Sequence, residues 1–405
     1  MDNVFLCRAY QICAAALLRI KPVKEQAVLT GEGSIVEAAD ILKENGIAAA
    51  EIITTAGTVK RGMLQPLTER LTELGIRYAI FDGVRSDPDT ECIEVAADMF
   101  VREGCGAIIA VGGGSAMDCA KIAAARVACP GKSVRKMKGL FKIHRKLPLL
   151  IAVPTTAGTG SEITVAAVVT DSEHDYKFTV MDFCLVPKAA VLDPALTRGL
   201  PPQITAETGM DAFTHAIEAY TNRFSSKHIN DCAVRALRLI DGNIRAAAED
   251  GSDMKARENM LTGAYYAGLA FTNGYVGYVH AIAHAIGGLY HVPHGRACAI
   301  VLPVVLESYG DAVFSSLARI ANELGVESGA GCSSGKTDAE KAAALIAHIR
   351  ELNRQLGIPD SFAELREKDI SLIARRAAAE ANPAYPVPRI FTESELADIV
   401  RKLMR

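Results

Sequence analysis

The first half of the chain alternates between two hydrophobic periods. Short runs rich in aliphatic and β-branched residues predict strands, and they cover residues 26–30, 50–55, 77–84, 106–115 and 147–156. Amphipathic runs between them predict helices, at residues 34–46, 63–75, 90–104 and 116–128. This strand–helix alternation indicates a parallel sheet with helices on both faces. Two further runs, 162–171 and 176–182, predict a β-hairpin, and a last strand is predicted at 189–193.

The pattern changes after the Asp-Pro pair at 193–194, where strand-like runs stop and long alanine-rich amphipathic segments take over. We therefore predict two domains, an α/β domain over residues 1–195 with a Rossmann-like parallel sheet and an all-α domain over residues 196–405. The spacing of Thr392 and Glu395 is that of a capping box, which predicts the start of the last helix.

Composition narrows the classes of function. The 405 residues carry 44 basic and 47 acidic side chains, so neither a basic surface for nucleic acid nor an acidic tail is expected. None of the ten cysteines forms a Cys-x-x-Cys pair, which favours a reducing, cytoplasmic compartment. The apolar run at 10–20 is too short to span a bilayer, so we expect a helix packed on the body and no membrane segment. The run at 325–338 predicts a surface loop.

A glycine turn ends the strand predicted to start at residue 106. Gly113 and Gly114 let the backbone turn tightly, and the following helix would offer its free N–H groups to a phosphate. Ser115 and Asp118 have the spacing of a capping box that would fix the start of that helix. The usual Gly-x-Gly-x-x-Gly pattern is absent, so a plain tight turn stands as the alternative to nucleotide binding.

A second loop follows the next predicted strand. It carries two glycines and the hydroxyls of Thr155, Thr156, Thr159 and Ser161. Hydroxyls and flexible backbone at the carboxyl end of a parallel strand suit the crevice in which α/β sheets bind nucleotides. Two such loops on successive strands favour a nucleotide site. The run at 329–337 resembles a P-loop, but it lacks the first glycine and follows a helical segment, so no NTPase is expected.

Histidines gather in the second half of the chain. Four of the nine lie within fifteen residues, namely His280, His284, His291 and His294. Asp211 and His215 lie one helical turn apart upstream and so share a helix face. His280 and His284 repeat that spacing, whereas His294 follows a proline in a predicted loop. One carboxylate with several imidazoles suits Fe²⁺ or Zn²⁺ better than Mg²⁺ or Ca²⁺, which prefer oxygen ligands.

A metal beside a nucleotide crevice suggests a Lewis acid that holds an alcohol oxygen. His284 would then be a spare histidine in the same cavity, where it would orient the substrate or relay a proton. A packing or capping role is the alternative for each histidine. We expect that role for His144, His174, His228 and His348. The role of His291 stays open, and a position outside the ligand set is favoured for it.

Four segments resemble those of the iron-containing (group III) alcohol dehydrogenases, in that family's order and spacing. They are GGGSAMDCAK, PTTAGTGSE, TGMDAFTHAIEAY and GYVHAIAHAIGGLYHVPHG. The resemblance covers residues 25–405 and implies a dehydroquinate synthase-like architecture, with the site in the cleft between an α/β and a helical domain. It implies an enzyme that interconverts a small primary alcohol and its aldehyde by hydride transfer with NAD or NADP. It also implies a homodimer or higher homo-oligomer.

The resemblance assigns roles by motif position. The implied ligands of one Fe²⁺ or Zn²⁺ are Asp211, His215, His280 and His294. His284 would lie near the nicotinamide as a catalytic residue outside the ligand set. The implied cofactor-binding residues are Gly113, Gly114, Ser115, Asp118, Thr155, Thr156, Thr159, Thr164 and Lys177.

Two positions depart from the family pattern. Gly31, followed by Glu32, occupies the place of an acidic residue that binds the ribose 2′-hydroxyl, so NADP becomes possible and the choice between NAD and NADP stays open. The family's PHGxxNA segment here contains Arg296 and has Cys298 in place of the asparagine. Cys298 would support the last histidine ligand differently. Arg296 adds a cation, for which a surface position is the simpler expectation.

Other functions compete with this one. A dehydroquinate-synthase-like lyase, or a polyol or glycerol-phosphate dehydrogenase, would share the fold. Those relatives tend to show three metal ligands, so the pairing of Asp211 with His215 favours an alcohol dehydrogenase. A metal-dependent hydrolase would leave both nucleotide loops unexplained, and two convergent ligand sites argue against a binding module without catalysis.

Overall fold

The computed structural model describes residues 4–20, 22–23, 25–173, 176–326 and 337–405, and of residues 13–20 it describes the backbone alone. The chain divides into two compact units. We call them the sheet unit, Val23–Leu200 with Gly251–Gly268, and the helical unit, Met1–Pro22 with Pro201–Asp250 and Leu269–Arg405. The predicted domain boundary near residue 195 stays a prediction.

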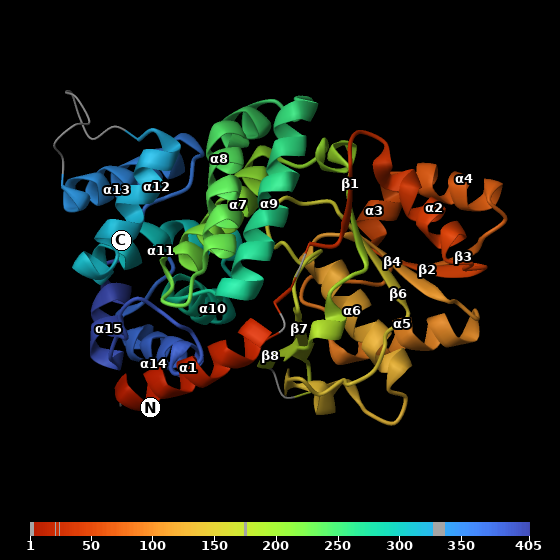
Figure 1. Cartoon of the computed structure of the whole chain (residues 1–405), viewed down its shortest axis with the longest axis horizontal. Helices are drawn as coiled ribbons and strands as arrows, with labels where there is room; N and C mark the ends of the chain where they lie inside the picture. Colours follow the sequence, from red (N-terminus) through yellow and green to blue (C-terminus); the bar gives the residue numbers. More distant parts are fainter. Residues whose placement is uncertain (1–3, 21, 24, 174–175, 327–336) are drawn as a thin grey trace. The chain divides into compact units, whose positions relative to one another are not determined.

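Six parallel strands form the main sheet of the sheet unit. In chain order they are β1 (Ala27–Thr30), β2 (Ala49–Ile53), β3 (Arg77–Phe81), β4 (Ala107–Gly112), β6 (Leu149–Pro154) and β9 (Ala189–Leu192). Their order in the sheet is β1-β9-β6-β4-β2-β3, as Figure 1 shows in part. Gly112 of β4 lies opposite Pro154 of β6, so these central strands end side by side. The parallel sheet predicted from the sequence is confirmed.

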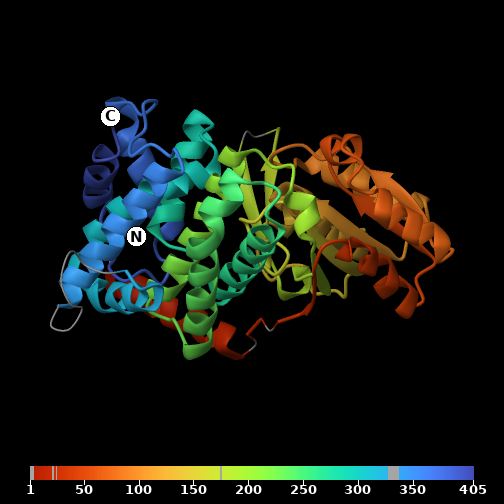
Figure 2. The same cartoon turned by 90° about the horizontal axis from the view of Figure 1, so that it is seen from above.

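Helices cover both faces of this sheet. On one face lie α2 (Glu37–Glu44) and α4 (Gln65–Glu73), and on the other α5 (Thr90–Arg102) and α6 (Gly114–Ala128), as Figures 1 and 2 show. Alternate residues of β4 enter the two cores, because side chains of a strand point to opposite faces. Ile109 and Val111 pack in the core with α2 and α4, whereas Ile108 and Ala110 pack in the core with α5 and α6.

A second, smaller sheet contains the predicted hairpin. β7 (Ala166–Asp171) and β8 (Tyr176–Met181) pair in the antiparallel sense, so the hairpin is confirmed. The short strand β5 (Gly139–Leu140), which the sequence did not predict, adds to β8. The remaining short elements of the unit are η1 (Ser34–Val36), α3 (Ala56–Lys60), η2 (Val134–Met137), η3 (Phe183–Leu185) and η4 (Pro194–Thr197).

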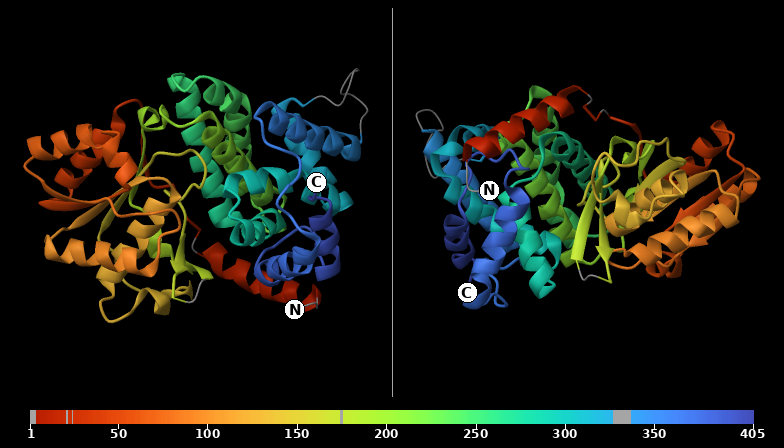
Figure 3. Two further views of the ribbon diagram at one scale, coloured as in Figure 1. Left: turned by 180° about the vertical axis from the view of Figure 1, so that it is seen from behind. Right: turned by 90° about the horizontal axis from the view of Figure 1, so that it is seen from below.

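The helical unit contains no strand among its described residues, apart from an isolated bridge between Phe362 and Met404. Its helices, shown in Figure 3, are α1 (Val4–Ile20), α7 (Pro202–Thr221), α8 (Lys227–Glu249), α10 (Tyr278–Tyr290), α11 (His294–Tyr309), α12 (Phe314–Leu324), α13 (Asp338–Gln355), α14 (Ile370–Ala381) and α15 (Glu393–Arg401). Two 3₁₀ turns, η5 (Gly310–Ala312) and η6 (Glu367–Asp369), accompany them. The predicted capping box of Thr392 and Glu395 starts α15. The all-α character of this part is confirmed.

The predicted N-terminal helix is α1, which packs on the C-terminal part of the helical unit (Figure 3). Arg8 donates hydrogen bonds to the carbonyls of Val387 and Pro388, and Gln11 donates to that of Tyr385. Throughout the described part of the chain, none of the helices has the length and apolar character needed to cross a membrane. The surface loop predicted at 325–338 lies largely outside the described residues.

Helix α9 (Met254–Gly274) supports the threonine-rich loop, and its first part belongs to the sheet unit. Gly160 of that loop has φ +61°, and a Cβ there would lie 2.6 Å from Cα of Gly268. A Cβ on Gly268 would in turn lie 2.7 Å from Cγ2 of Ile163. The two backbones can approach this closely only because both residues are glycine. The loop is therefore fixed by direct backbone packing on α9.

Glu51 on β2 is an unusual core residue that generates a prediction for stability. Its side chain is fully buried, and neither carboxyl oxygen has a hydrogen-bond partner among the described residues. Burial raises the pKa of Glu51 from 4.5 to about 8, against the opposing charge of Arg102. The folded chain therefore binds this proton more tightly than the unfolded chain, and stability should fall as pH rises through that window.

We expect Glu51→Gln to remove this pH dependence, because glutamine does not titrate. Thermal midpoints of the parent and the variant should separate in favour of the variant as pH rises from 4.5 to about 8. Glu69→Gln, on the exposed surface of α4, is the control and should leave the parent's profile unchanged. Parallel profiles for the parent and Glu51→Gln would contradict the prediction.

Candidate metal centre and cofactor loops

Three helices of the helical unit present the predicted metal ligands to one another. α7 carries Asp211 and His215 one turn apart, α10 carries His280, and α11 begins with His294. The expectation that His294 lies in a loop is wrong. Pro293 is the N-cap of α11, and a proline at a helix start is compatible with the helix because its missing N–H would have no partner there.

One carboxyl oxygen forms the centre of the cluster. Asp211 Oδ1 lies 3.3 Å from Nε2 of His294, 3.6 Å from Nε2 of His280 and 4.0 Å from Nδ1 of His215. Asp211 Oδ1, His215 Nδ1 and His280 Nε2 are buried, yet none has a hydrogen-bond partner within the described part of the chain. Buried polar atoms without partners are costly. A divalent cation among them would remove that cost, so the donor set fits Fe²⁺ or Zn²⁺.

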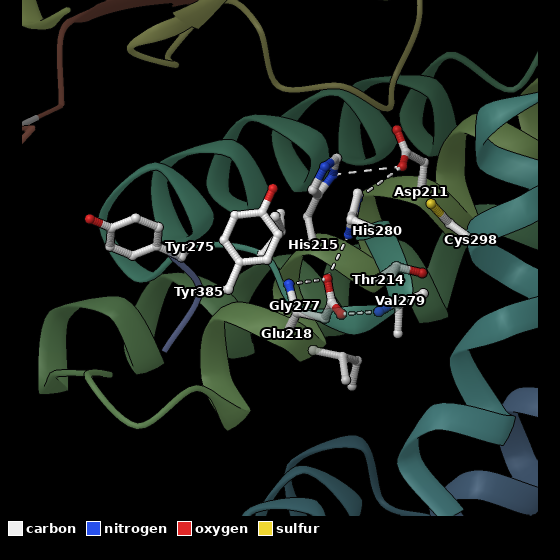
Figure 4. Close-up of polar contacts among 12 residues, drawn as sticks. Asp211, Thr214, His215, Glu218, Tyr275, Gly277, Val279, His280, Cys298 and Tyr385 are labelled. Carbon is white, nitrogen blue, oxygen red and sulfur yellow. Dashed lines mark hydrogen bonds and ion pairs between the residues drawn. The ribbon is translucent and has the colours of Figure 1, made fainter. Parts of the chain in front are cut away.

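The four potential ligand atoms that lie closest together include one that was not predicted and leave out His215. Asp211, His280, His294 and Cys298 each offer one ligand atom, and these atoms all lie within 4.8 Å of one another. His215 lies just outside this group, with its ring stacked on that of His280 at 4.4 Å between centroids. Figure 4 shows Asp211, His215, His280 and Cys298 together. The structure thus brings the four predicted ligands into one cluster and adds a thiol.

Glu218 is a residue of this centre that the sequence did not single out. Its carboxylate lies 2.6 Å from Nδ1 of His280 and accepts hydrogen bonds of 2.8 Å from the backbone N–H groups of Gly277 and Val279, as Figure 4 shows. An acidic partner on one ring nitrogen fixes the tautomer and leaves the other nitrogen free for a metal. Glu218 lies about one helical turn after His215 on α7, and this spacing was the sequence feature that could have placed it near the metal centre.

We expect Glu218→Gln to weaken metal binding by about 10- to 100-fold, the usual effect of losing such a partner. Glutamine would direct an N–H₂ group at N–H donors, since the three groups facing Glu218 donate to it. Competition with a chromophoric chelator measures the affinity. The control is Glu307→Gln on α11, which removes an exposed charge that faces Arg350. Equal affinities in both variants would contradict this role.

His284 lies beside the cluster and has its own acidic partner. Its Nδ1 lies 2.7 Å from Oε1 of Glu380, which also accepts a hydrogen bond of 2.8 Å from the hydroxyl of Tyr385. The ring of His284 stacks on that of His294 at 5.0 Å between centroids. His284 is half exposed and is not among the clustered ligand atoms. Its catalytic role stays a prediction, and Glu380 and Tyr385 belong to no motif that the sequence offered.

Two members of the cluster, His215 and Asp211, have the ionisation state that a cation needs, whereas the pKa values of His280 and His294 are raised above the usual value for histidine. Burial lowers the pKa of His215 to about 3, so its imidazole is neutral at neutral pH. Burial would raise the pKa of Asp211, but His215 and His294 outweigh it and keep that carboxyl ionised. Burial also opposes a charge on His294, but Cys298 and Asp211 raise its pKa to about 10. A proton therefore competes with a cation for His294, and metal affinity should decrease as the pH is lowered.

The two predicted cofactor loops pack directly on each other in the sheet unit. The glycine turn has no room for side chains. A Cβ on Gly114 would lie 2.9 Å from Cγ2 of Thr159, and a Cβ on Gly113 would lie 3.3 Å from Oγ1 of Thr156. The backbone N–H of Thr155 donates to the carbonyl of Gly112, which joins the ends of β4 and β6. The two loops thus form one surface at the start of α6.

The predicted capping box at the start of α6 is wrong. The helix begins at Gly114 with Gly113 as N-cap, so Ser115 lies inside the helix. Asp118 is engaged elsewhere: its Oδ1 accepts from the hydroxyl of Ser161 at 2.8 Å, and its Oδ2 accepts from the N–H of Val168 at 3.0 Å. The glycines let the backbone enter the helix earlier, and the carboxylate ties the helix to the second loop and β7.

Lys121 on α6, which no sequence motif indicates, organises the same region. Its fully buried ammonium donates to the hydroxyls of Ser161 and Thr164 and to the carbonyls of Thr164 and Ala166. Burial lowers its pKa to about 8, against the charges of Asp118 and Glu162. Thr164, predicted to contact the cofactor, therefore has its hydroxyl bound to Lys121.

Three other singled-out residues have charged neighbours. Lys177, a predicted cofactor residue, pairs with Asp87 at 2.7 Å in an exposed position. Glu32 pairs with Arg198 at 3.3 Å. Arg296 was expected at the surface but is only about a quarter exposed, and it lies 3.8 Å from a carboxyl oxygen of Glu364.

Comparisons with known proteins agree with this geometry. The profile described as iron-containing alcohol dehydrogenase matches residues 25–194, and that of the C-terminal part of the Fe-containing alcohol dehydrogenase family matches residues 205–404. The chain therefore belongs to the iron-containing alcohol dehydrogenase family. It is an oxidoreductase that interconverts alcohols and aldehydes with a nicotinamide cofactor.

Individual relatives match over nearly their whole length. The NAD-dependent methanol dehydrogenase of Bacillus methanolicus is 34% identical over 380 residues, which are 93% of this chain and 98% of that protein. The 1,3-propanediol dehydrogenase of Klebsiella pneumoniae is 39% identical over 357 residues, 87% of this chain and 90% of the relative. The crystal structure of a 1,3-propanediol oxidoreductase matches with a TM-score of 0.89 and 35% identity, over 93% of this chain and 98% of the other.

Proposed function

We propose that this chain oxidises small primary alcohols, or reduces their aldehydes, at a single Fe²⁺ or Zn²⁺ held by Asp211, His215, His280 and His294. The observation that supports it most strongly is the set of three buried donor atoms, from Asp211, His215 and His280, that converge without hydrogen-bond partners in the described structure. The relatives named for methanol and 1,3-propanediol support a short substrate. A bound divalent ion would act as a Lewis acid that lowers the pKa of an alcohol hydroxyl.

The residues around the ion would divide the remaining tasks. Glu218 holds Nδ1 of His280, which directs Nε2 of that ring to Asp211. Glu380 lies at Nδ1 of His284 in the same way, which would leave Nε2 of His284 available as the acceptor for the proton of the alcohol. In the sheet unit, the glycine turn and the N-terminus of α6 would bind the pyrophosphate of NAD or NADP through backbone N–H groups.

The choice between NAD and NADP and the assembly go beyond the family assignment. Arg198 faces the carboxylate of Glu32 and so reduces its repulsion of a ribose 2′-phosphate, which supports use of NADP as well as NAD. We also propose a homodimer or higher homo-oligomer in the cytoplasm. The absence of any disulfide among the described cysteines supports that compartment.

We expect Asp211→Ala and His280→Ala each to abolish metal-dependent oxidation of NADH or NADPH with little loss of fold. The metal-stripped protein is reloaded with Fe²⁺ or Zn²⁺ and offered short aldehydes, and absorbance at about 340 nm reports turnover. Circular dichroism and the thermal midpoint report the fold. Turnover in both variants without metal would refute the metal mechanism.

The glycine turn makes a separate prediction for the cofactor. Gly114→Ala should raise the dissociation constant of NADH at least about tenfold, because its methyl group would displace Thr159 and crowd the phosphate approach. Isothermal titration measures the constant, and the bound metal should stay at the parent's level. Gly131→Ala is the matched control, since a Cβ there meets nothing within 4 Å. Tight NADH binding to Gly114→Ala would exclude the turn as the phosphate site.

A further inference from the structure

We propose that Cys298 is a metal ligand, so that the ion is bound by a thiolate together with the Asp211 carboxylate and the imidazoles of His280 and His294. His215, whose Nδ1 lies 4.0 Å from Asp211 Oδ1, would remain in the set as a fifth and more distant donor. This inference deepens the proposed function and rests on the metal site assigned there. It concerns a position at which this chain, with Cys298, departs from the PHGxxNA pattern that its segment PHGRACA resembles.

Helix geometry brings the thiol to the cluster. His294 is the first residue of α11 and Cys298 follows one turn later, so both side chains leave the same face of the helix. Cys298 is fully buried. Its Sγ lies 3.6 Å from Nε2 of His294, and it lies within 4.8 Å of the donor atoms of Asp211 and His280. Figure 4 shows its sulfur directed toward His280 and Asp211.

The distances agree with those of ligands that share one ion. Tetrahedral zinc with a Zn–S bond of about 2.3 Å and Zn–N and Zn–O bonds of about 2.0–2.1 Å separates sulfur from nitrogen by about 3.5 Å and oxygen from nitrogen by about 3.4 Å. The structure has 3.6 Å from Cys298 Sγ to His294 Nε2. It has 3.3 and 3.6 Å from Asp211 Oδ1 to Nε2 of His294 and His280.

A thiol that merely packs beside His294 explains less. Such a thiol provides one weak donor, whereas Asp211 Oδ1 and His280 Nε2 are both buried and both lack a hydrogen bond in the described chain. Cys232 and His228 offer an internal comparison on α8. They have the same four-residue spacing and a separation of 4.0 Å, but they belong to no cluster of ligand atoms among the described residues.

A thiolate ligand has consequences for the choice of metal. Sulfur is a soft donor that favours Zn²⁺ over Mn²⁺ and other hard cations, whereas carboxylate oxygen suits both. A divalent ion bound by three neutral imidazoles and one carboxylate keeps a net charge of plus one. With Asp211 and Cys298 both anionic, the net charge of the site would be zero. The residue at position 298 would therefore shift the metal preference of this chain toward zinc.

Zinc X-ray absorption spectroscopy tests the inference directly. The full chain is stripped of metal and loaded with one equivalent of Zn²⁺. We expect one sulfur neighbour at about 2.3 Å, which is lost in Cys298→Ser and kept in Cys232→Ser, the matched control. With Co²⁺ in place of Zn²⁺, a near-ultraviolet thiolate-to-cobalt charge-transfer band should appear and should follow the same pattern. The ratio of Zn²⁺ to Mn²⁺ affinity should fall at least about tenfold in Cys298→Ser.

The outcomes separate this inference from the proposed function. A parent protein that binds one Zn²⁺ through nitrogen and oxygen alone, and still turns over, overturns the inference and keeps the function. A parent that binds no metal, or turns over without it, refutes the proposed function itself. Cys298→Asn, which restores the family residue, is measured alongside in case Cys298→Ser does not fold. A sulfur neighbour retained in Cys298→Asn would also overturn the inference.

Discussion

The helical unit depends on a buried carboxyl oxygen that faces imidazole nitrogens across 3.3 to 4.0 Å. Asp211 and His280 are almost fully buried, and a carboxylate in such surroundings is costly unless a charge compensates it. Hydrogen bonds from the described residues do not provide that compensation for Oδ1. The packing of α7, α10 and α11 therefore brings together groups whose charges a bound divalent cation would balance.

Glu218 links this centre to the chain's secondary structure. The same carboxylate that contacts His280 accepts two N–H groups at the start of α10, where a helix has N–H groups without partners. A Cβ on Gly277 would lie 2.8 Å from Oε1 of Glu218, so the carboxylate also fills the space that a side chain would occupy. One residue of α7 thus caps α10 and orients the ring of His280.

Much of the fold was predictable because it follows from local patterns. The alternation of periods 2 and 3.6 gave the strands and helices of the sheet unit, and the Asp211–His215 spacing gave a shared helix face. The start of α11 was not predictable from Pro293, because a proline before a histidine suits both a loop and a first helical turn. That error concealed the alignment of His294 with Cys298. Lys121 and Glu380 were missed because burial and partners far along the chain, not their neighbours in sequence, give them their roles.

The partners of the histidines explain how similar imidazoles take different roles. His280 and His284 lie one turn apart on α10, and each has a carboxylate at Nδ1, from Glu218 and Glu380 respectively. In a neutral ring, an N–H at Nδ1 that faces the carboxylate leaves Nε2 as the free nitrogen. For His280 that nitrogen is buried 3.6 Å from Asp211, which suits a ligand. His284 is half exposed and lies outside the group of ligand atoms, which suits a group that exchanges protons with a substrate. The contact with Asp211 and the burial of Nε2, and not the histidine pattern itself, thus separate the surroundings of His280 from those of His284.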